Sequence, residues 1–166
     1  LDLLRQTRIR ATTRKQQLHW GCSRIACGIL GVVRNKVTYM DASKKKILLV
    51  EDDSALATVY RSRLELEGFE ISEVNNGEDA LSAAVAFRPD LVLLDAMMPK
   101  ISGFDVLDIL RNTPETTNIR VIMLTALSQP KDKERAEQLG VDDYLVKSQV
   151  VIGDVVARVK FHLGVM

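Results

Sequence analysis

The chain has 166 residues, of which 46% are apolar and 27% are charged, and its formal net charge is +1. This length fits one domain with an appendage, because single domains cluster at about 100 to 150 residues. No apolar run approaches the ~20 residues that a membrane span needs, which excludes an integral membrane protein. We therefore expect a cytoplasmic protein that makes no membrane contact.

The net charge hides an uneven distribution along the chain. Residues 1–39 carry 8 Lys/Arg against one acidic residue, whereas residues 40–166 carry 15 Lys/Arg against 21 Asp/Glu. An acidic main body argues against a nucleic-acid surface there. We expect no direct nucleic-acid binding.

The basic segment at the start has no convincing helical or strand period. We expect residues 1–39 to be a basic extension that is disordered or non-native, with Met40 as the native start. A genuine amphipathic or disordered basic arm is the alternative. Cys22 and Cys27, with only His19 nearby, offer too few ligands for a structural zinc site, so free thiols are expected.

Short apolar runs alternate with helical patterns over residues 44–163. The expected strands are ILLV (47–50), EISEV (70–74), DLVLLD (90–95), RVIMLTA (120–126) and DYLVK (143–147). The helical patterns after them span residues 54–67, 78–87, 103–111, 131–139 and 150–162. Runs such as LVLL are apolar at successive positions, which is typical of strands covered on both faces. The pattern predicts an α/β fold with a doubly wound, five-stranded parallel sheet, because every connection is a helical crossover.

Polar and charged side chains follow four of the expected strands. They are Glu51, Asp52 and Asp53 after the first, Asp95 after the third, Thr125 with Ala126 after the fourth, and Lys147 after the fifth. Such sheets bind ligands beyond the carboxyl ends of their strands, where the winding order reverses. Carboxylates that converge there raise one another's pKa unless a cation is present, and hard oxygen ligands without His or Cys favour Mg²⁺.

A cation would also let this acidic edge accept a phosphoryl group. Lys147 supplies a second positive charge, and the Thr125 hydroxyl can donate a hydrogen bond. Asp95 is the best candidate nucleophile because it stands alone at its strand end, while Glu51 and Asp52 are adjacent and suited to holding metal. The MMPKISG loop after Asp95 turns tightly into the third helix, and a backbone carbonyl there can complete the metal shell.

Five motifs resemble, in their order, those of response-regulator receiver domains: VEDD, LLDAMMP, ISGFDVL, MLTA and DYLVK. Such domains belong to two-component, phosphorelay signal transduction. The chain looks like a single receiver of the chemotaxis type. The resemblance covers about 120 residues and implies the flavodoxin-like strand order 2-1-3-4-5. It implies a phosphoprotein that forms an aspartyl phosphate at Asp95 and catalyses only its own phosphorylation and dephosphorylation. Glu51 and Asp52 would be the acidic pair, and Asp52, Asp95 and the Met97 carbonyl would hold Mg²⁺.

The same resemblance makes Thr125 and Lys147 the pair that senses the phosphoryl group, and Tyr144 an aromatic switch. The phosphoryl donor would be a sensor histidine kinase or a histidine phosphotransfer protein. An output partner would bind the surface of the fourth helix, fifth strand and fifth helix, and a homodimer formed on phosphorylation is left open. From the residues alone, Tyr144 fits a half-buried strand aromatic equally well.

One residue departs from the family pattern. Receiver domains usually place Pro after the lysine, often with a cis peptide bond, and this chain has Ser148. A cis Lys147–Ser148 bond would cost about 3 kcal/mol, so the geometry of this loop is left open.

Three other functions are alternatives. A degenerate receiver that serves only as a binding module is disfavoured because all five site residues are present. A phosphohydrolase of the haloacid-dehalogenase type needs a second Asp two positions after the nucleophile, where this chain has Met97. A flavodoxin-like FMN carrier needs a Ser/Thr/Gly-rich phosphate loop where Glu51, Asp52 and Asp53 stand.

Overall fold

The computed structural model describes residues 44–165. The expected basic extension at residues 1–39, Met40 and both cysteines lie outside the described residues. The elements are β1 (Lys46–Val50), α1 (Ser54–Leu66), β2 (Glu70–Val74), α2 (Gly77–Phe87), β3 (Leu91–Leu94), α3 (Gly103–Asn112), β4 (Arg120–Thr125), α4 (Pro130–Gln138), β5 (Asp143–Val146) and α5 (Ile152–Leu163).

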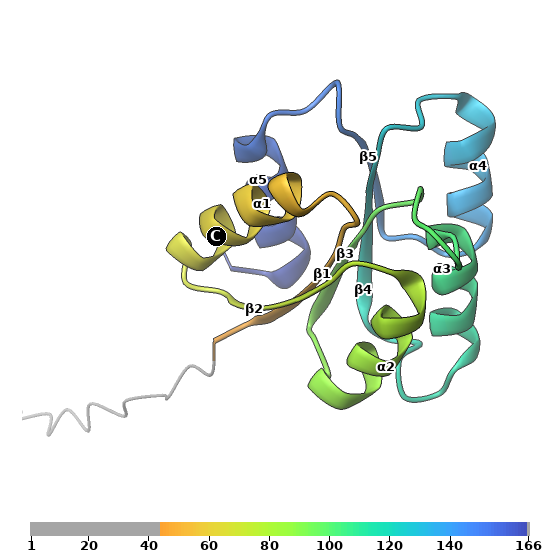
Figure 1. Cartoon of the computed structure of the whole chain (residues 1–166), viewed down its shortest axis with the longest axis horizontal. Coiled ribbons are helices and arrows are strands. Elements are labelled where there is room, and N and C mark those ends of the chain that lie inside the picture. Colours follow the sequence, from red (N-terminus) through yellow and green to blue (C-terminus); the bar gives the residue numbers. More distant parts are fainter. Residues whose placement is uncertain (1–43, 166) are drawn as a thin grey trace, which may run out of the picture. The chain divides into compact units, whose positions relative to one another are not determined.

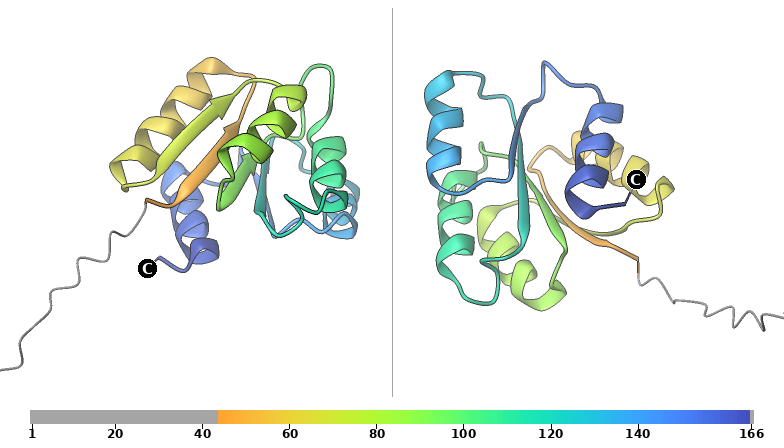
Figure 2. Two further views of the ribbon diagram at one scale, coloured as in Figure 1. Left: turned by 90° about the horizontal axis from the view of Figure 1, so that it is seen from below. Right: turned by 180° about the vertical axis from the view of Figure 1, so that it is seen from behind.

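The five strands form one parallel sheet in the order β2-β1-β3-β4-β5, which confirms the predicted fold class and strand order (Figure 1). Helices cover both faces of the sheet (Figure 2). The chain winds from β1 to β2 on one side and then crosses to β3 on the other. The winding order therefore reverses between β1 and β3, which is where such sheets bind ligands.

Two hydrophobic clusters fill the space between the sheet and the helices. Alternate strand residues divide between them, because successive side chains of a strand point to opposite faces. Ile47 and Leu49 belong to the cluster under α1 and α5, whereas Leu48 and Val50 belong to the cluster under α2, α3 and α4. All four are buried, which explains why these strands read as continuous apolar runs.

Strand register brings the ends of the central strands to one edge. Val50 of β1 pairs with Leu94 of β3, and Asp95 N donates a hydrogen bond to Val50 O at 3.0 Å. The residues directly after these strands, Glu51 and Asp95, are therefore neighbours at the carboxyl edge.

Candidate phosphoacceptor site

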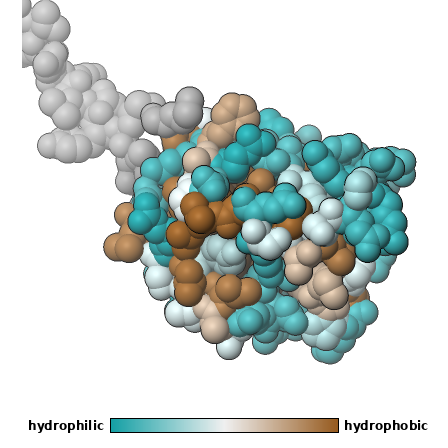
Figure 3. Space-filling model, turned by 90° about the horizontal axis from the view of Figure 1, so that it is seen from above, coloured by the Kyte–Doolittle hydropathy of each residue, from teal (hydrophilic) through white to brown (hydrophobic). Residues whose placement is uncertain are grey.

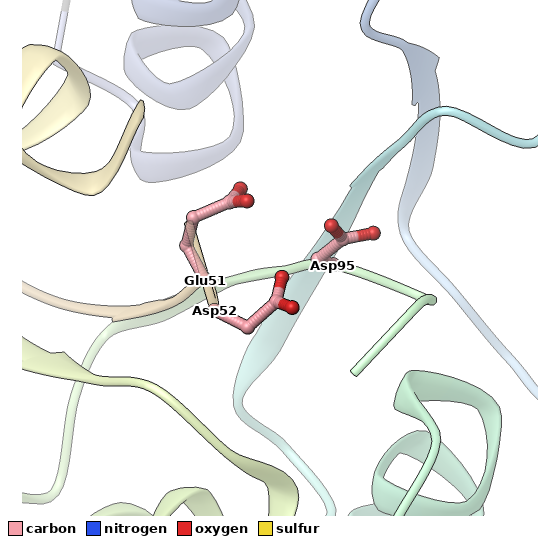
Figure 4. Close-up of side chains that lie close together, drawn as sticks. All are labelled: Glu51, Asp52 and Asp95. Carbon is pink, nitrogen blue, oxygen red and sulfur yellow. The ribbon is translucent and has the colours of Figure 1, made fainter. Parts of the chain in front are cut away.

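Three carboxylates meet at the carboxyl edge, as the sequence predicted. Glu51 and Asp52 follow β1, and Asp95 follows β3 (Figure 4). One carboxylate oxygen from each of the three lies within 4.8 Å of the others. Glu51 is 3% exposed and Asp95 is 5% exposed, while Asp52 is open to solvent. The cluster thus combines two buried acids with one accessible acid.

Asp53 has a structural role, which agrees with its place outside the acidic pair of Glu51 and Asp52. Its carboxylate accepts hydrogen bonds from Ala55 N at 2.9 Å and Leu56 N at 3.1 Å. These are backbone donors of the first turn of α1, which have no partner inside the helix. Asp53 is therefore the N-cap of α1 and anchors the helix directly after the acidic pair.

Lys147 enters the cluster from the end of β5. Its Nζ donates to the Asp95 Oδ2 oxygen at 2.7 Å and lies 2.8 Å from the Glu51 carboxylate. None of the peptide bonds between residues 44 and 165 is cis, so the Lys147–Ser148 bond is trans. The lysine therefore reaches both buried carboxylates without the cis bond that the family often has.

Burial and charge shift the pKa values of this group. Burial raises the pKa of Glu51, and the hydrogen bond and charge of Lys147 oppose this only in part. Burial alone would lower the pKa of Lys147, but its hydrogen bonds to Asp95 and Glu51 outweigh that effect and raise the pKa. Lys147 is therefore held in its charged form between two acids.

Thr125 is the last residue of β4 and is fully buried. Its Oγ1 accepts a hydrogen bond from Leu127 N at 3.3 Å, and its carbonyl accepts one from Lys147 N at 2.8 Å. The hydroxyl proton stays available for a further acceptor. Ala126, which the sequence placed at the same strand end, is exposed.

The backbone of the β3–α3 loop is hydrogen-bonded to the Asp95 side chain. Met97 N donates to Asp95 Oδ1 at 3.0 Å, while the Met97 side chain is 55% exposed. Lys100, further along the loop, has a φ of 68°, a left-handed conformation that is uncommon outside glycine. The loop is therefore held in a tight shape directly after the candidate nucleophile.

Gly103 has a role that the sequence only partly revealed. The sequence predicted a tight return there, but the structure also packs this first residue of α3 against the candidate nucleophile. A Cβ at Gly103 would lie 2.0 Å from Asp95 O and 2.7 Å from Ala96 Cα. Only glycine permits this approach, and the signal in the sequence was a lone glycine shortly after the acidic residue.

Tyr144 of β5 is partly buried and packs against the cluster under α2, α3 and α4. Its hydroxyl donates to Leu127 O at 3.0 Å. The ring also lines a cavity of about 440 Å³, together with Ser128, Gln129 and Lys133 beside the start of α4. Tyr144 therefore touches the same loop residue that binds the Thr125 hydroxyl.

The two histidines stay apart from the acidic cluster. His19 lies outside the described residues. His162 is on α5, and its Nε2 lies 3.2 Å from Asp143 Oδ2. No helix between residues 44 and 165 has the length and apolar character that crossing a membrane requires.

Comparisons with known proteins agree with this geometry. The family described as response regulator receiver domain matches residues 47–160. The transcriptional regulator RpaA of Synechocystis is 38% identical over 115 residues, which are 69% of this chain and 47% of that protein. The phosphate regulon regulator PhoB of Rhizobium meliloti is 40% identical over 118 residues, or 71% of this chain and 52% of that protein. The chain thus spans about half the length of these curated relatives.

Solved structures lead to the same family. The receiver domain of the Francisella response regulator 1452 superposes with a TM-score of 0.67 at 30% identity, covering 72% of this chain and 96% of that one. A CheY-like receiver domain from Methanospirillum hungatei gives a TM-score of 0.69 at 25% identity, covering 74% of this chain and 95% of that one.

The chain belongs to the family of response-regulator receiver domains. It therefore carries a phosphoaccepting domain of two-component signalling, which acts as a signalling phosphoacceptor rather than as an enzyme on other substrates. The three clustered carboxylates are consistent with that activity.

Proposed function

We propose that Asp95 accepts a phosphoryl group and that residues 44–163 form the receiver domain that responds to it. The observation that carries this assignment is the contact of Lys147 Nζ with both Asp95, at 2.7 Å, and the Glu51 carboxylate, at 2.8 Å. A cation at this point can stabilise the negative charge of the Asp95 carboxylate and then that of an incoming phosphoryl oxygen. Backbone neighbours also fix Asp95, because Met97 N donates to its Oδ1 oxygen and Gly103 packs against its carbonyl.

The reaction uses a lone pair on one Asp95 carboxylate oxygen. The carboxylate now bonds Lys147 through Oδ2 and Met97 N through Oδ1. Each oxygen keeps a further lone pair, so one of them can attack phosphorus, and the bond from phosphorus to the donor's histidine nitrogen breaks with the electron pair staying on that nitrogen. Lys147 then balances charge on the transferred group, and the Thr125 hydroxyl donates to one of its oxygens.

The donor set also fits Mg²⁺. Three carboxylates with oxygens within 4.8 Å of one another provide hard oxygen ligands and no competing His or Cys. We assign Glu51, Asp52, Asp95 and the Met97 carbonyl as the residues that would hold the ion. When bound, Mg²⁺ would neutralise charge between the carboxylates and the phosphoryl oxygens.

A chain of contacts leads from the site to the surface. A hydrogen bond from Thr125 to a phosphoryl oxygen would move the Oγ1 that now accepts from Leu127 N, and Leu127 O is the acceptor of the Tyr144 hydroxyl. We assign Thr125 and Tyr144 as the switch residues on this basis. The output partner would bind α4, β5 and α5, next to the cavity that Tyr144 lines.

A phosphoaccepting aspartate needs a phosphoryl donor and an output partner. We propose a cytoplasmic protein that receives its phosphoryl group from a sensor histidine kinase or a histidine phosphotransfer protein. Residues 40–166 carry 15 Lys/Arg against 21 Asp/Glu, so we propose a protein output partner rather than direct contact with nucleic acid. Sedimentation analysis of the phosphorylated chain tests for homodimer formation.

Chemical trapping tests the assignment at the level of the residue. Borohydride reduces an aspartyl phosphate to homoserine, which peptide sequencing by mass spectrometry can locate. After phosphorylation with acetyl phosphate and Mg²⁺, we expect homoserine at position 95. Homoserine at position 52 or 53 instead would overturn the choice of nucleophile.

A further inference from the structure

The β3–α3 loop exposes a methionine beside the phosphoacceptor. The Met97 side chain is 55% exposed, whereas Met123 on β4 is fully buried and Met98 packs partly buried against the cluster under α2, α3 and α4. Figure 3 shows the molecule from above the view of Figure 1, and apolar side chains reach the surface there between polar ones. Met97 is the most exposed of these three residues, so we expect its thioether to react first with a soluble oxidant.

The backbone of Met97 is fixed beside Asp95. Met97 N donates to Asp95 Oδ1 at 3.0 Å, and Gly103 N donates to Ala96 O at 3.0 Å where the loop returns into α3. The approach of Gly103 to the Asp95 carbonyl leaves no space for even a methyl group. The loop is therefore braced on both sides of Met97.

The electrostatics of the site make an added oxygen unfavourable there. Carboxylate oxygens of Glu51, Asp52 and Asp95 already lie within 4.8 Å of one another, and the phosphoryl group brings further negative charge. Oxidation of a thioether gives a sulfoxide, whose polarised oxygen carries partial negative charge and accepts hydrogen bonds. A sulfoxide on this loop would repel the incoming anion and compete for its donors.

We propose that Met97 is a reversible oxidation site through which peroxide slows phosphoryl acceptance by Asp95. Hydrogen peroxide transfers one oxygen atom to the Met97 sulfur, which loses two electrons, while the O–O bond breaks and water leaves. Methionine sulfoxide reductase removes the oxygen again as water at the expense of a dithiol. The inference rests on the proposed function of Asp95.

The first half of the test measures oxidation. The full chain is treated with dilute hydrogen peroxide, digested and mapped by mass spectrometry, with fragment ions separating Met97 from Met98. We expect oxidation to be fastest at Met97, slower at Met98 and slowest at Met123. Met40 and Met166, which lie outside the described residues, are scored from their own peptides.

The second half measures the rate of phosphorylation by acetyl phosphate with Mg²⁺, before oxidation, after it, and after treatment with the reductase. We expect a several-fold slower rate in the oxidised wild type and recovery after reduction. Met97→Leu and Met98→Leu are each compared with their own untreated rate. Peroxide should leave the rate of Met97→Leu unchanged and should still slow Met98→Leu.

Three results would overturn the proposal: equal oxidation of Met97 and Met123, an unchanged rate once Met97 is oxidised, or an equal loss in Met97→Leu. A wild type that takes no phosphoryl group before oxidation would overturn the proposed function as well. Normal acceptance without a peroxide effect would overturn only the role of Met97.

Discussion

Lys147 is a largely buried cation that two buried acids hold in place. Its side chain is 16% exposed, and those of Glu51 and Asp95 are 3% and 6% exposed. Such a group is costly to assemble, because each charge loses its water, and removal of one partner leaves the others uncompensated. The arrangement is therefore better explained by the reaction it serves than by stability.

Replacement of the lysine tests whether these charges are buried in solution. Lys147→Met should lower the free energy of unfolding by about 3 kcal/mol, because Glu51 and Asp95 would stay buried without their cation. Lys160→Met removes a lysine of the same length from a more exposed ion pair with Glu67 and should leave stability nearly unchanged. Urea denaturation of the two variants makes the comparison, and equal losses would show that the Lys147 contacts are not buried in solution.

The raised pKa of Glu51 predicts how Mg²⁺ binding depends on pH. Because the folded state binds the Glu51 proton more readily than the unfolded state does, its contribution to the stability of the metal-free protein falls as pH rises through the window between the two pKa values. Metal binding needs the carboxylate, so Mg²⁺ affinity should fall on acidification while the pH is still above the ordinary glutamate pKa.

Calorimetric titration with Mg²⁺ at a series of pH values measures this dependence. Glu51→Gln should bind Mg²⁺ more weakly and should lose the upper step of the pH profile. An affinity that stays constant down to the ordinary glutamate range would contradict a raised Glu51 pKa.

At the scale of single residues, the acidic cluster was predictable because Glu51 and Asp95 directly follow strands and Asp52 follows Glu51. Register then places Glu51 and Asp95 side by side. The contacts of the Tyr144 hydroxyl and the trans peptide bond at Ser148 could not be predicted, because both depend on how a loop packs in three dimensions. The roles assigned to these residues stay predictions until the reaction is measured.

At the scale of secondary structure, the start of α3 is the tightest point near the site. Gly103 lies against backbone atoms of Asp95 and Ala96, which cannot move aside cheaply. The helices and strands themselves were predictable from alternating apolar runs and helical patterns. This close approach was not, because a sequence shows a glycine but not the atoms that it faces.

A pair of glycine variants isolates the contact. Gly103→Ala should lower the free energy of unfolding by about 2 to 4 kcal/mol and weaken Mg²⁺ binding, because the new methyl group displaces Asp95. Gly153→Ala on α5 meets nothing within 4 Å and should raise stability by up to about 1 kcal/mol, since alanine favours a helix. Urea unfolding and Mg²⁺ titration report both effects; a Gly103→Ala variant as stable as wild type would contradict the packing.

The fourth helix is held less firmly than the third. α4 buries one residue, Ala136, whereas α3 buries five. The N-cap residue of α4, Gln129, makes no side-chain capping hydrogen bond. We expect amides of residues 130–138 to exchange with deuterium faster than those of 103–112, because local opening exposes little apolar surface. Equal protection of the two helices by hydrogen exchange would contradict the weaker anchoring of α4.

At the scale of the whole molecule, the fold follows from one sheet whose carboxyl edge collects residues far apart in the sequence. The strand order was predictable because crossover helices force parallel pairing and the motifs occur in the family's order. The basic segment before Met40 lacks such a pattern, so its role could not be derived from physical arguments.

Removal of that segment tests the proposed domain boundary. A chain that begins at Met40 should accept a phosphoryl group at the rate of the full chain, because all the site residues lie between Glu51 and Lys147. The two rates are compared by intact mass over time. A truncated chain that is folded but slow would assign residues 1–39 a part in the reaction.

The most direct measurement is the intact mass of the chain after incubation with acetyl phosphate, with and without Mg²⁺, for wild type, Asp95→Ala and the exposed control Asp108→Ala. We predict one phosphate adduct on the wild type and on Asp108→Ala that requires Mg²⁺, and none on Asp95→Ala. An adduct that persists in folded Asp95→Ala, or its absence from folded wild type with Mg²⁺ present, would contradict the assignment of Asp95 as the phosphoacceptor.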